Sequence, residues 1–260
     1  MSGLPAPETS LEASVVVPAK DEETLIARCL EALARQEGIL NERYEVLLVL
    51  DHCSDATEER AWEVGEKHPE LRLHFLAGPG CGVGHARRAG MEVAYARLME
   101  VGRPRGLIVS TDADSVAAED WVAAQISLAE EGAKAIGGRI ELEGDGDSLP
   151  ENVLAWYESQ SRSRYRRVLS SSLSEKSPEH WQFSGASLSL TAEAYREIGG
   201  LPPQADLEDE HLERTLEEKG VEITRSSTVK VTTSARTLGR ASRGLARSLS
   251  EAARRSADDG

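Results

Sequence analysis

The sequence predicts an α/β fold in which a mostly parallel central sheet is flanked by helices. Short apolar runs alternate along the chain with segments whose apolar residues recur at helical spacing, a pattern typical of βαβ units. The first apolar run is ended by proline, and two later runs lead into aspartates, as expected of short strands in a sheet. With 260 residues, 40% of them hydrophobic, the chain can form one large α/β domain or two small ones.

The first half of the chain contains five runs with the length and composition of strands: residues 14–18, 45–50, 71–76, 107–109 and 134–142. Helices are expected between them: residues 25–38, 56–67, 85–99 and 121–131. A glycine-rich turn at residues 77–84 precedes the third helix, where backbone amides could approach a phosphate. Its spacing matches neither the dinucleotide-binding fingerprint nor the P-loop.

Composition changes after residue 142, where a Gly- and Asp-rich stretch predicts a linker. Beyond it we expect these helices and strands: helices at 151–169, 192–198 and 207–219, and strands at 182–190 and 221–231. The predicted parts of the chain are a loose N-terminus (1–13), a first half (14–142), a second half of the same domain (143–232) and an arginine-rich tail (233–260).

Charge and cysteine content exclude several classes of protein. The formal net charge of -15 argues against general nucleic-acid binding, because phosphate backbones need a basic surface. No apolar run approaches the length of a membrane span, and we expect no signal peptide. The three cysteines fit neither a zinc site nor a disulfide framework, so a cytoplasmic protein is expected. The tail could still lie on an anionic membrane surface or close over a pyrophosphate.

Two carboxylates directly follow the predicted strand at residues 107–109. Asp112 and Asp114 are separated by the small residue Ala113. Open α/β sheets bind ligands at the carboxyl ends of their strands, so both side chains are expected at a ligand-binding edge. Their oxygens suit Mg²⁺ or Mn²⁺ carrying a phosphate. The alternative is an ordinary strand-to-helix turn in which one aspartate caps the next helix.

Two further groups of charged residues each allow two interpretations. Four arginines, Arg162, Arg164, Arg166 and Arg167, lie shortly before a polar loop, and could meet an anionic acceptor or form a solvated face. The acids Glu208–Glu210 begin a predicted helix, where the helix dipole alone favours acidic residues.

Six motifs together carry a resemblance to a known family: SVVVPAKDEE, LLVLDHCSDAT, GVGHARRAG, STDADS, FSGASLSLTAEAYREIGGLP and LEDEHLERTLEEKG. In this order and spacing, over residues 14–231, the chain resembles the family 2 glycosyltransferases of the GT-A fold. The sequence departs from the family pattern at two places. Arg88 stands where the family has Asn, and the family's usual Arg on the last helix is absent at its expected place, with Arg214 one residue away.

The resemblance implies a Rossmann-like nucleotide-sugar-binding half at residues 14–142 and an acceptor-binding half at residues 143–232. Nucleotide-sugar contacts are implied for Val17, Pro18, Ala19, Glu22, Asp51, Arg87, Asp112, Ala113 and Asp114. Acceptor-side positions are implied for Ser184, Gly185, Ala186 and Glu208. Among these residues Asp51 would bond the base edge, and the DXD motif of Asp112 and Asp114 would bind the metal. Asp209 would be the catalytic base.

The implied activity is a metal-dependent, inverting transfer of a sugar from a UDP- or GDP-type nucleotide sugar to an acceptor hydroxyl. The acceptor would be a small molecule or lipid-linked. A divalent cation and a nearby arginine would stabilise the leaving diphosphate, and Asp209 would accept the proton of the attacking hydroxyl.

Three alternatives remain open: a retaining transferase of the same fold, a nucleotidyltransferase of similar architecture, and a catalytically silent nucleotide-sugar-binding scaffold. The Gln-x-x-Arg-Trp motif and membrane helices of processive polysaccharide synthases do not appear in the sequence, which favours a single-transfer enzyme.

Overall fold

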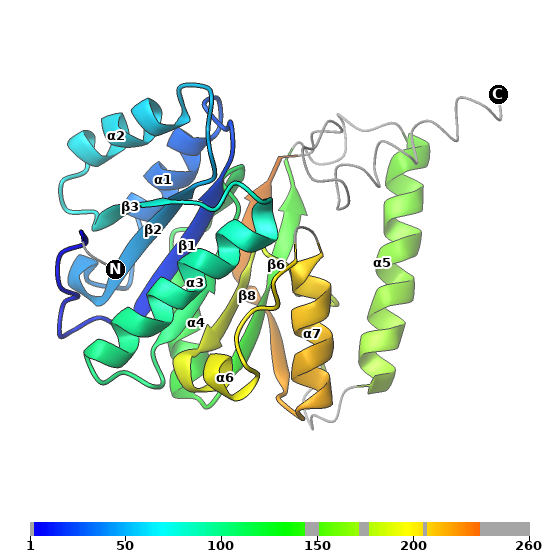
Figure 1. The fold of residues 1–260 in the computed structure, drawn as a ribbon. Helices are drawn as coiled ribbons and strands as arrows, with labels where there is room; N and C mark the ends of the chain where they lie inside the picture. Colours follow the sequence, from blue (N-terminus) through cyan, green and yellow to red (C-terminus); the bar gives the residue numbers. More distant parts are fainter. Residues whose placement is uncertain (1–2, 144–150, 172–176, 205–206, 235–260) are drawn as a thin grey trace.

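The computed structural model describes residues 3–143, 151–171, 177–204 and 207–234. Most of the predicted linker, the centre of the polar loop around residue 174 and the tail from residue 235 lie outside the described residues. The described strands form one twisted sheet with helices on both faces (Figure 1), as the sequence predicts.

The sheet consists of eight described strands: β1 (Ala13–Ala19), β2 (Tyr44–Leu50), β3 (Leu73–Ala77), β4 (Leu107–Ser110), β5 (Ser115–Ala117), β6 (Ala135–Leu142), β7 (Leu188–Thr191) and β8 (Ile223–Thr233). Their order across the sheet is β3-β2-β1-β4-β7-β6-β8-β5. Of the described pairings, four are parallel and three antiparallel. The first four strands run parallel, whereas β7 runs against both of its neighbours.

Seven described α-helices surround the sheet: α1 (Ile26–Ala34), α2 (Thr57–Lys67), α3 (Val83–Glu100), α4 (Trp121–Glu130), α5 (Glu151–Ser171), α6 (Ala192–Glu197) and α7 (Glu208–Glu218). One core packs α1, α2 and α4 on the sheet, and a second core packs α3, α6 and α7. Val15 and Val17 of β1 enter the first core and Val16 enters the second, because successive strand residues point to opposite faces. Burial on both faces explains why the β1 sequence, apart from Ser14, is apolar.

Helix α5 stands beside α7 (Figure 1), and two of its arginines are engaged by acids. The Arg164 guanidinium stacks over the Trp181 ring, 4.7 Å from its centroid, and lies 3.9 Å from the Glu210 carboxylate. Arg162 pairs with Glu158 of its own helix at 3.3 Å. These contacts favour the interpretation of the basic cluster as a charged face.

The strand predicted at residues 182–190 is shorter in the structure, because β7 begins at Leu188. The side chain of Gln182 takes the place of strand backbone: its Oε1 accepts from Ile140 N at 2.9 Å and its Nε2 donates to Ile140 O at 2.8 Å. A Cβ on Gly137 would lie 2.5 Å from Gln182 O, so glycine permits this close approach. The sequence does not predict β5, a three-residue strand that pairs with β8.

The described part of the N-terminal segment is packed, where the composition predicts a loose start. Leu11 is fully buried in the second core. The carbonyl oxygen of Pro5 accepts from Arg97 Nη1 at 2.8 Å, and Glu8 pairs with Arg72 at 2.6 Å. Leu11 and the partly buried Leu4, the bond to α3 and the ion pair just before β3 therefore order this segment.

A buried ion pair fastens α3 to the start of β2. Arg97 Nε and Nη2 donate to the two oxygens of Glu45 at 2.8 and 2.6 Å, and the two side chains are 8% and 2% exposed. Ser14 Oγ donates to the same carboxylate at 2.7 Å, and His74 Nε2 lies 3.4 Å from it. Burial alone would raise the pKa of Glu45, but hydrogen bonds from His74, Arg97 and Ser14 and the charge of Arg97 lower it to about 2.

The Glu45 network predicts a specific acid dependence of stability. A carboxyl whose pKa falls from 4.5 to about 2 on folding stabilises the folded state above pH 4.5, and this contribution is lost as the pH falls through about 2. Glu45→Gln leaves the Arg97 charge buried without its counter-ion, so we expect it to cost about 3–5 kcal/mol of unfolding free energy at pH 7. In urea titrations, the difference in unfolding free energy between Glu45→Gln and the wild-type protein should become smaller as the pH falls from 4.5 to about 2. If this difference did not change with pH, Glu45 would not be the group responsible for the acid dependence.

Candidate functional site

The parallel strands β2, β1 and β4 end side by side at one edge of the sheet. Ala19 is in register with Leu50, and β4 ends at Ser110. Asp51 and Asp112 follow these ends and therefore emerge at the same edge. Ligands of open α/β sheets bind outside the carboxyl ends of the strands, so this edge is the candidate site.

The predicted residues of β1 lie beneath this edge. Val17, Pro18 and Ala19 are buried, and the side chains of Val17 and Ala19 belong to the first core. A ligand at the edge would meet their backbone rather than their side chains. Glu22 is 6% exposed, and its carbonyl oxygen accepts the amide hydrogens that begin α1.

Asp51 holds the glycine-rich turn before α3. Its Oδ1 accepts from Gly80 N at 2.6 Å and its Oδ2 from Gly82 N at 3.3 Å, and the residue is 3% exposed. A Cβ on Gly78 would lie 2.7 Å from Oδ1, and Gly80 has a φ of +72°, a left-handed conformation that favours glycine. The residue implied to bond a base thus has both oxygens engaged by the turn.

Arg87 lies at the centre of the site, on the second turn of α3. Its Nε donates to Glu208 at 2.8 Å and its Nη2 to Asp112 at 2.7 Å. Its Nη1 donates to Ser110 Oγ at 2.5 Å and to the Gly185 carbonyl at 3.1 Å. Burial alone would lower the pKa of Arg87, but Asp112 and Glu208 raise it above its usual value, so the guanidinium is charged.

Asp112 and Asp114 flank Ala113 in the turn that follows β4, which is closed by the bond from Ser115 N to Asp112 O at 3.0 Å. Asp112 and Asp114 are partly exposed, whereas Ala113 between them is 3% exposed. Asp114 Oδ1 accepts from Thr233 Oγ1 at 3.4 Å, so its carboxylate lies beside the end of β8. Both acids are therefore partly accessible to solvent at this edge.

The surroundings of Cys29 test whether these acids suit a cation. The buried Cys29 thiol donates to the Asp112 carbonyl oxygen at 3.5 Å; burial raises its pKa, and the charges of Asp114, Asp112 and Glu22 raise it further, which indicates an acidic neighbourhood. An acidic neighbourhood with oxygen donors fits a hard divalent cation such as Mg²⁺ or Mn²⁺. Asp112 and Asp114, each partly exposed, would hold the cation.

A different group, Asp21, Cys53 and Asp55, has three potential ligand atoms within 4.8 Å of one another in the described chain. Asp21 Oδ1 accepts from Ser54 N at 2.6 Å, and Asp55 Oδ1 accepts from Thr57 N at 3.0 Å. The Ser54–Asp21 bond and the bond from Glu23 N to Asp55 Oδ2 at 3.1 Å tie the loop after β1 to the loop after β2, which accounts for the grouping.

The acids at the start of α7 meet the same centre. Glu208 is 4% exposed; burial raises its pKa, the Arg87 charge opposes the rise, and Asp209 adds to it. Asp209 is partly exposed, and its Oδ2 accepts from Gly185 N at 3.2 Å. Leu207, immediately before the helix, has a φ of +58°, an uncommon left-handed conformation for a leucine.

The predicted acceptor-side turn joins these groups. Ser184 O accepts from Ser187 N at 2.8 Å, which closes the turn, and Ala186 O accepts from Thr111 Oγ1 at 2.9 Å. A Cβ on Gly185 would overlap the Arg87 guanidinium, so a larger residue at this position would have to displace the guanidinium from its partners. The structure therefore brings Arg87, Asp112, Gly185, Glu208 and Asp209 into direct contact, whereas Asp51 is bonded to the glycine-rich turn.

Sequence reasoning missed two residues of this centre. Ser110 accepts from Arg87, and a Cβ on Gly84 would lie 3.0 Å from Glu208 Oε2. Ser110 opens the STDADS motif and could have been found there. No local pattern distinguishes Gly84 from the other glycines of its turn.

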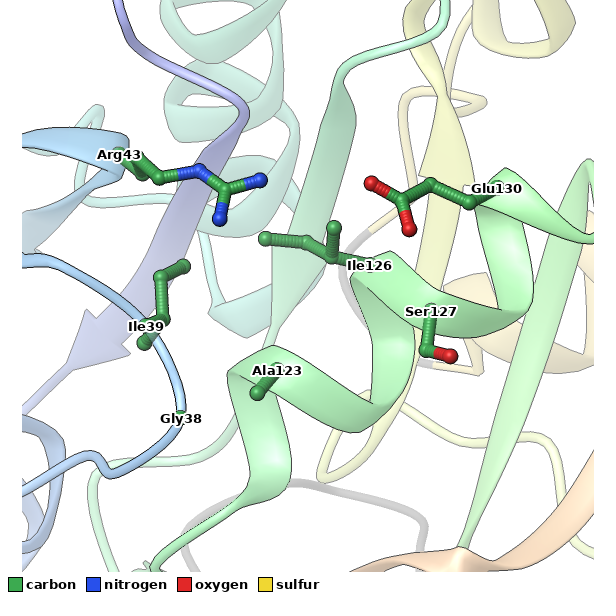
Figure 2. A pocket seen from close by; sticks show the side chains of 7 residues that line it. All are labelled: Gly38, Ile39, Arg43, Ala123, Ile126, Ser127 and Glu130. Carbon is green, nitrogen blue, oxygen red and sulfur yellow. The ribbon is translucent and has the colours of Figure 1, made fainter.

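A separate hollow lies between the loop before β2 and helix α4 (Figure 2). It is lined by Gly38, Ile39, Arg43, Ala123, Ile126, Ser127 and Glu130. Residues before β2, and the end of α4 just before the parallel strand β6, lie at the amino-terminal edge of the sheet. This hollow is therefore at the edge opposite the candidate site.

Comparisons with known proteins indicate the kind of protein to which this chain is similar. The model of the family described as Glycosyl transferase family 2 matches residues 14–188. A search of curated proteins finds no match. No helix among the described residues is long and apolar enough to cross a membrane.

Several solved structures have a similar fold. S. aureus TarS has a TM-score of 0.61 and 16% identity, over 86% of this chain and 37% of that one. Its 1-349 form in complex with UDP-GlcNAc has a TM-score of 0.62 and 17% identity, over 90% of this chain and 62% of that one. Mannosyltransferase PcManGT from Pyrobaculum calidifontis, in complex with GDP-Man and Mn²⁺, has a TM-score of 0.63 and 19% identity, over 100% of this chain and 68% of that one. The chain thus spans little more than a third of full TarS, and identities this low show the fold alone.

Proposed function

Because the chain belongs to glycosyl transferase family 2, we propose that it transfers a sugar from a nucleoside-diphosphate sugar to an acceptor hydroxyl, with a divalent cation and inversion at the anomeric carbon. The chain has the GT-A fold, an α/β sheet flanked by helices. One observation carries the proposal: two pairs of acids, Asp112 with Asp114 and Glu208 with Asp209, meet at one sheet edge around Arg87.

The donor side of the proposal rests on the DXD motif. Asp112 and Asp114 would hold Mg²⁺ or Mn²⁺, and the cation would neutralise the charge that develops on the leaving diphosphate. GDP-Man and Mn²⁺ in PcManGT and UDP-GlcNAc in TarS support a donor of the GDP or UDP type. The glycine-rich turn held by Asp51 lies at the same edge and supports a nucleotide-binding role for residues 14–142.

The acceptor side rests on Asp209. This carboxylate is partly exposed, hydrogen-bonded by Gly185 N and adjacent to the buried Glu208. Such a group can accept the proton of a hydroxyl that attacks the face opposite the leaving diphosphate, and this direct displacement inverts the anomeric carbon. We propose Ser184–Ala186 and Glu208 as the acceptor-side wall, within residues 143–232.

The acceptor is proposed to be a small molecule or a lipid-linked hydroxyl. The arginine-rich tail, which lies outside the described residues, would supply any peripheral membrane contact. Three free cysteines, Cys29, Cys53 and Cys81, support a reducing, cytoplasmic location.

A thermal-shift screen tests the donor half of the proposal. UDP-, GDP- and dTDP-sugars are compared with and without Mn²⁺. At 100 times its Kd a ligand of the folded state should raise the Tm by about 5–10 °C in a domain of this size. We expect one nucleotide class to give this shift and to need the metal. A folded sample that responds to no donor would favour the silent scaffold. Incubation of the responding donor with hydroxyl acceptors then tests transfer, and NMR of the product separates inversion from retention.

A further inference from the structure

Arg87 is placed as a buried connector rather than as a cation open to a ligand. Its side chain is 3% exposed, and four hydrogen bonds engage nearly all the N–H groups of its guanidinium. An arginine that binds a phosphate directly needs free N–H groups facing the ligand. The N–H groups of Arg87 instead donate to acceptors within the protein. This arrangement differs from the nucleotide contact that the family resemblance implies for Arg87.

The acceptors of Arg87 come from both halves of the chain. Asp112 and Ser110 follow or end β4 in the donor half, whereas Glu208 begins α7 and Gly185 lies in the turn before β7. Arg87 and Glu208 are separated by 121 positions in the sequence. A fork-shaped, permanently charged group can hold two carboxylates at fixed positions, which a lysine cannot do.

Two short paths lead from Arg87 to Asp209. One passes through Glu208, its direct neighbour in the chain. The other passes through a single residue: Gly185 accepts from Arg87 with its carbonyl and donates to Asp209 with its amide. Movement of the guanidinium would therefore displace Asp209, and Gly185 lies so close to the guanidinium that a Cβ built on it would overlap Arg87 Nη2.

We propose that Arg87 is a positioning residue that locks the Asp112 side of the site to Asp209, so that the proton acceptor is in place only when the Asp112–Arg87–Glu208 contacts are intact. This inference rests on the proposed function for its kinetic consequence. Its structural part, the coupling of Asp112 to Glu208 through Arg87, does not depend on transfer.

The kinetic test is a double-mutant cycle of Arg87→Lys and Asp209→Asn, measured as single-turnover transfer. Arg87→Lys keeps the charge but cannot form the fork, and misplacing a reacting group by about 1 Å can cost about 10²-fold. We expect Arg87→Lys to lower the transfer rate constant by about that factor with little change in acceptor KM. In the Asp209→Asn background the same substitution should change the rate constant by less than about 2-fold. Equal effects in both backgrounds would overturn the proposal.

The chain contains a matched control for this experiment. Arg97 lies on the same helix and forms a buried two-bond pair with Glu45, at the opposite edge of the sheet. Arg97→Lys should lower the Tm about as much as Arg87→Lys but leave the rate constant unchanged at temperatures well below unfolding. A loss of turnover in both variants would mean that Arg87 acts through stability alone.

A second cycle keeps the inference testable if the wild-type protein transfers no sugar. Asp112→Asn and Glu208→Gln are combined, and the midpoints of urea unfolding are compared. When Arg87 is present, the shifts in urea midpoint caused by Asp112→Asn and by Glu208→Gln should be non-additive in the double variant. In the Arg87→Met background the two shifts should be additive. Additive shifts in both backgrounds would overturn the coupling. Non-additive shifts without any transfer activity would overturn the proposed function and leave the coupling intact.

Discussion

Replacing Asp209 with Asn is expected to lower transfer by about 10²–10⁴-fold, the contribution typical of a general base. The Asp209 carboxylate accepts from Gly185 N at 3.2 Å, and the asparagine oxygen can accept the same bond. The geometry around Arg87 should therefore persist, and the variant should lose mainly the ability to take a proton from the attacking hydroxyl. Donor binding should stay near normal, because the acids proposed for the metal lie on the loop after β4.

Initial rates at saturating donor, together with donor titration by calorimetry, measure the two effects separately. Glu210→Gln is the matched control, since Glu210 occupies the same first turn of α7, is exposed, and lies 3.9 Å from Arg164. We expect this control to retain transfer within about 2-fold, the usual range for a surface change. Undiminished transfer by Asp209→Asn would remove Asp209 from the role of base, and a large loss of donor affinity would place Asp209 on the donor side.

Replacing Asp114 with Asn should lower transfer by about 10²–10³-fold and remove the metal-dependent part of donor binding. The substitution keeps the size of the side chain and its bond from Thr233, which is 3.4 Å from Oδ1. What it removes is one of the two carboxylate charges proposed to hold the cation. The thermal shift that a donor gives with Mn²⁺ should therefore fall to the shift that it gives without metal.

Asp120→Asn is the control for this second experiment. Asp120 lies six residues further along, is exposed, and precedes α4 without a side-chain capping bond. The control should keep the wild-type response to donor and Mn²⁺. If Asp114→Asn also kept that response, the metal site would lie elsewhere, and the group of Asp21, Cys53 and Asp55 would be the next one to substitute.

For Asp51, the sequence predicts the position of the residue but not the contacts that its carboxylate makes. The aspartate follows β2, and its place at the sheet edge is predictable from the alternation of strands and helices. Its bonds to Gly80 and Gly82 are not predictable, because they depend on how the turn before α3 folds back over the edge. A base at this edge would therefore meet a carboxylate that already accepts two amide hydrogens.

The sequence by itself determined the features that depend on neighbouring residues. A strand that is buried on both faces needs an apolar run such as Val15–Val17. The central parallel strands could therefore be predicted from the apolar runs in the sequence. The positions of Asp112 and Asp114 directly after a predicted strand placed both acids at the carboxyl edge of the sheet, where both are partly exposed and Ala113 is buried.

The tertiary structure alone decided what joins the two halves of the site. Gln182 replaces strand backbone beside Ile140, and Arg87 bonds Asp112 and Glu208 at once. Both contacts connect residues far apart in the sequence, and both depend on the direction of a side chain after the sheet has formed. Local propensity and spacing carry no information about such contacts, because a buried charge finds its partners through the packing of whole elements.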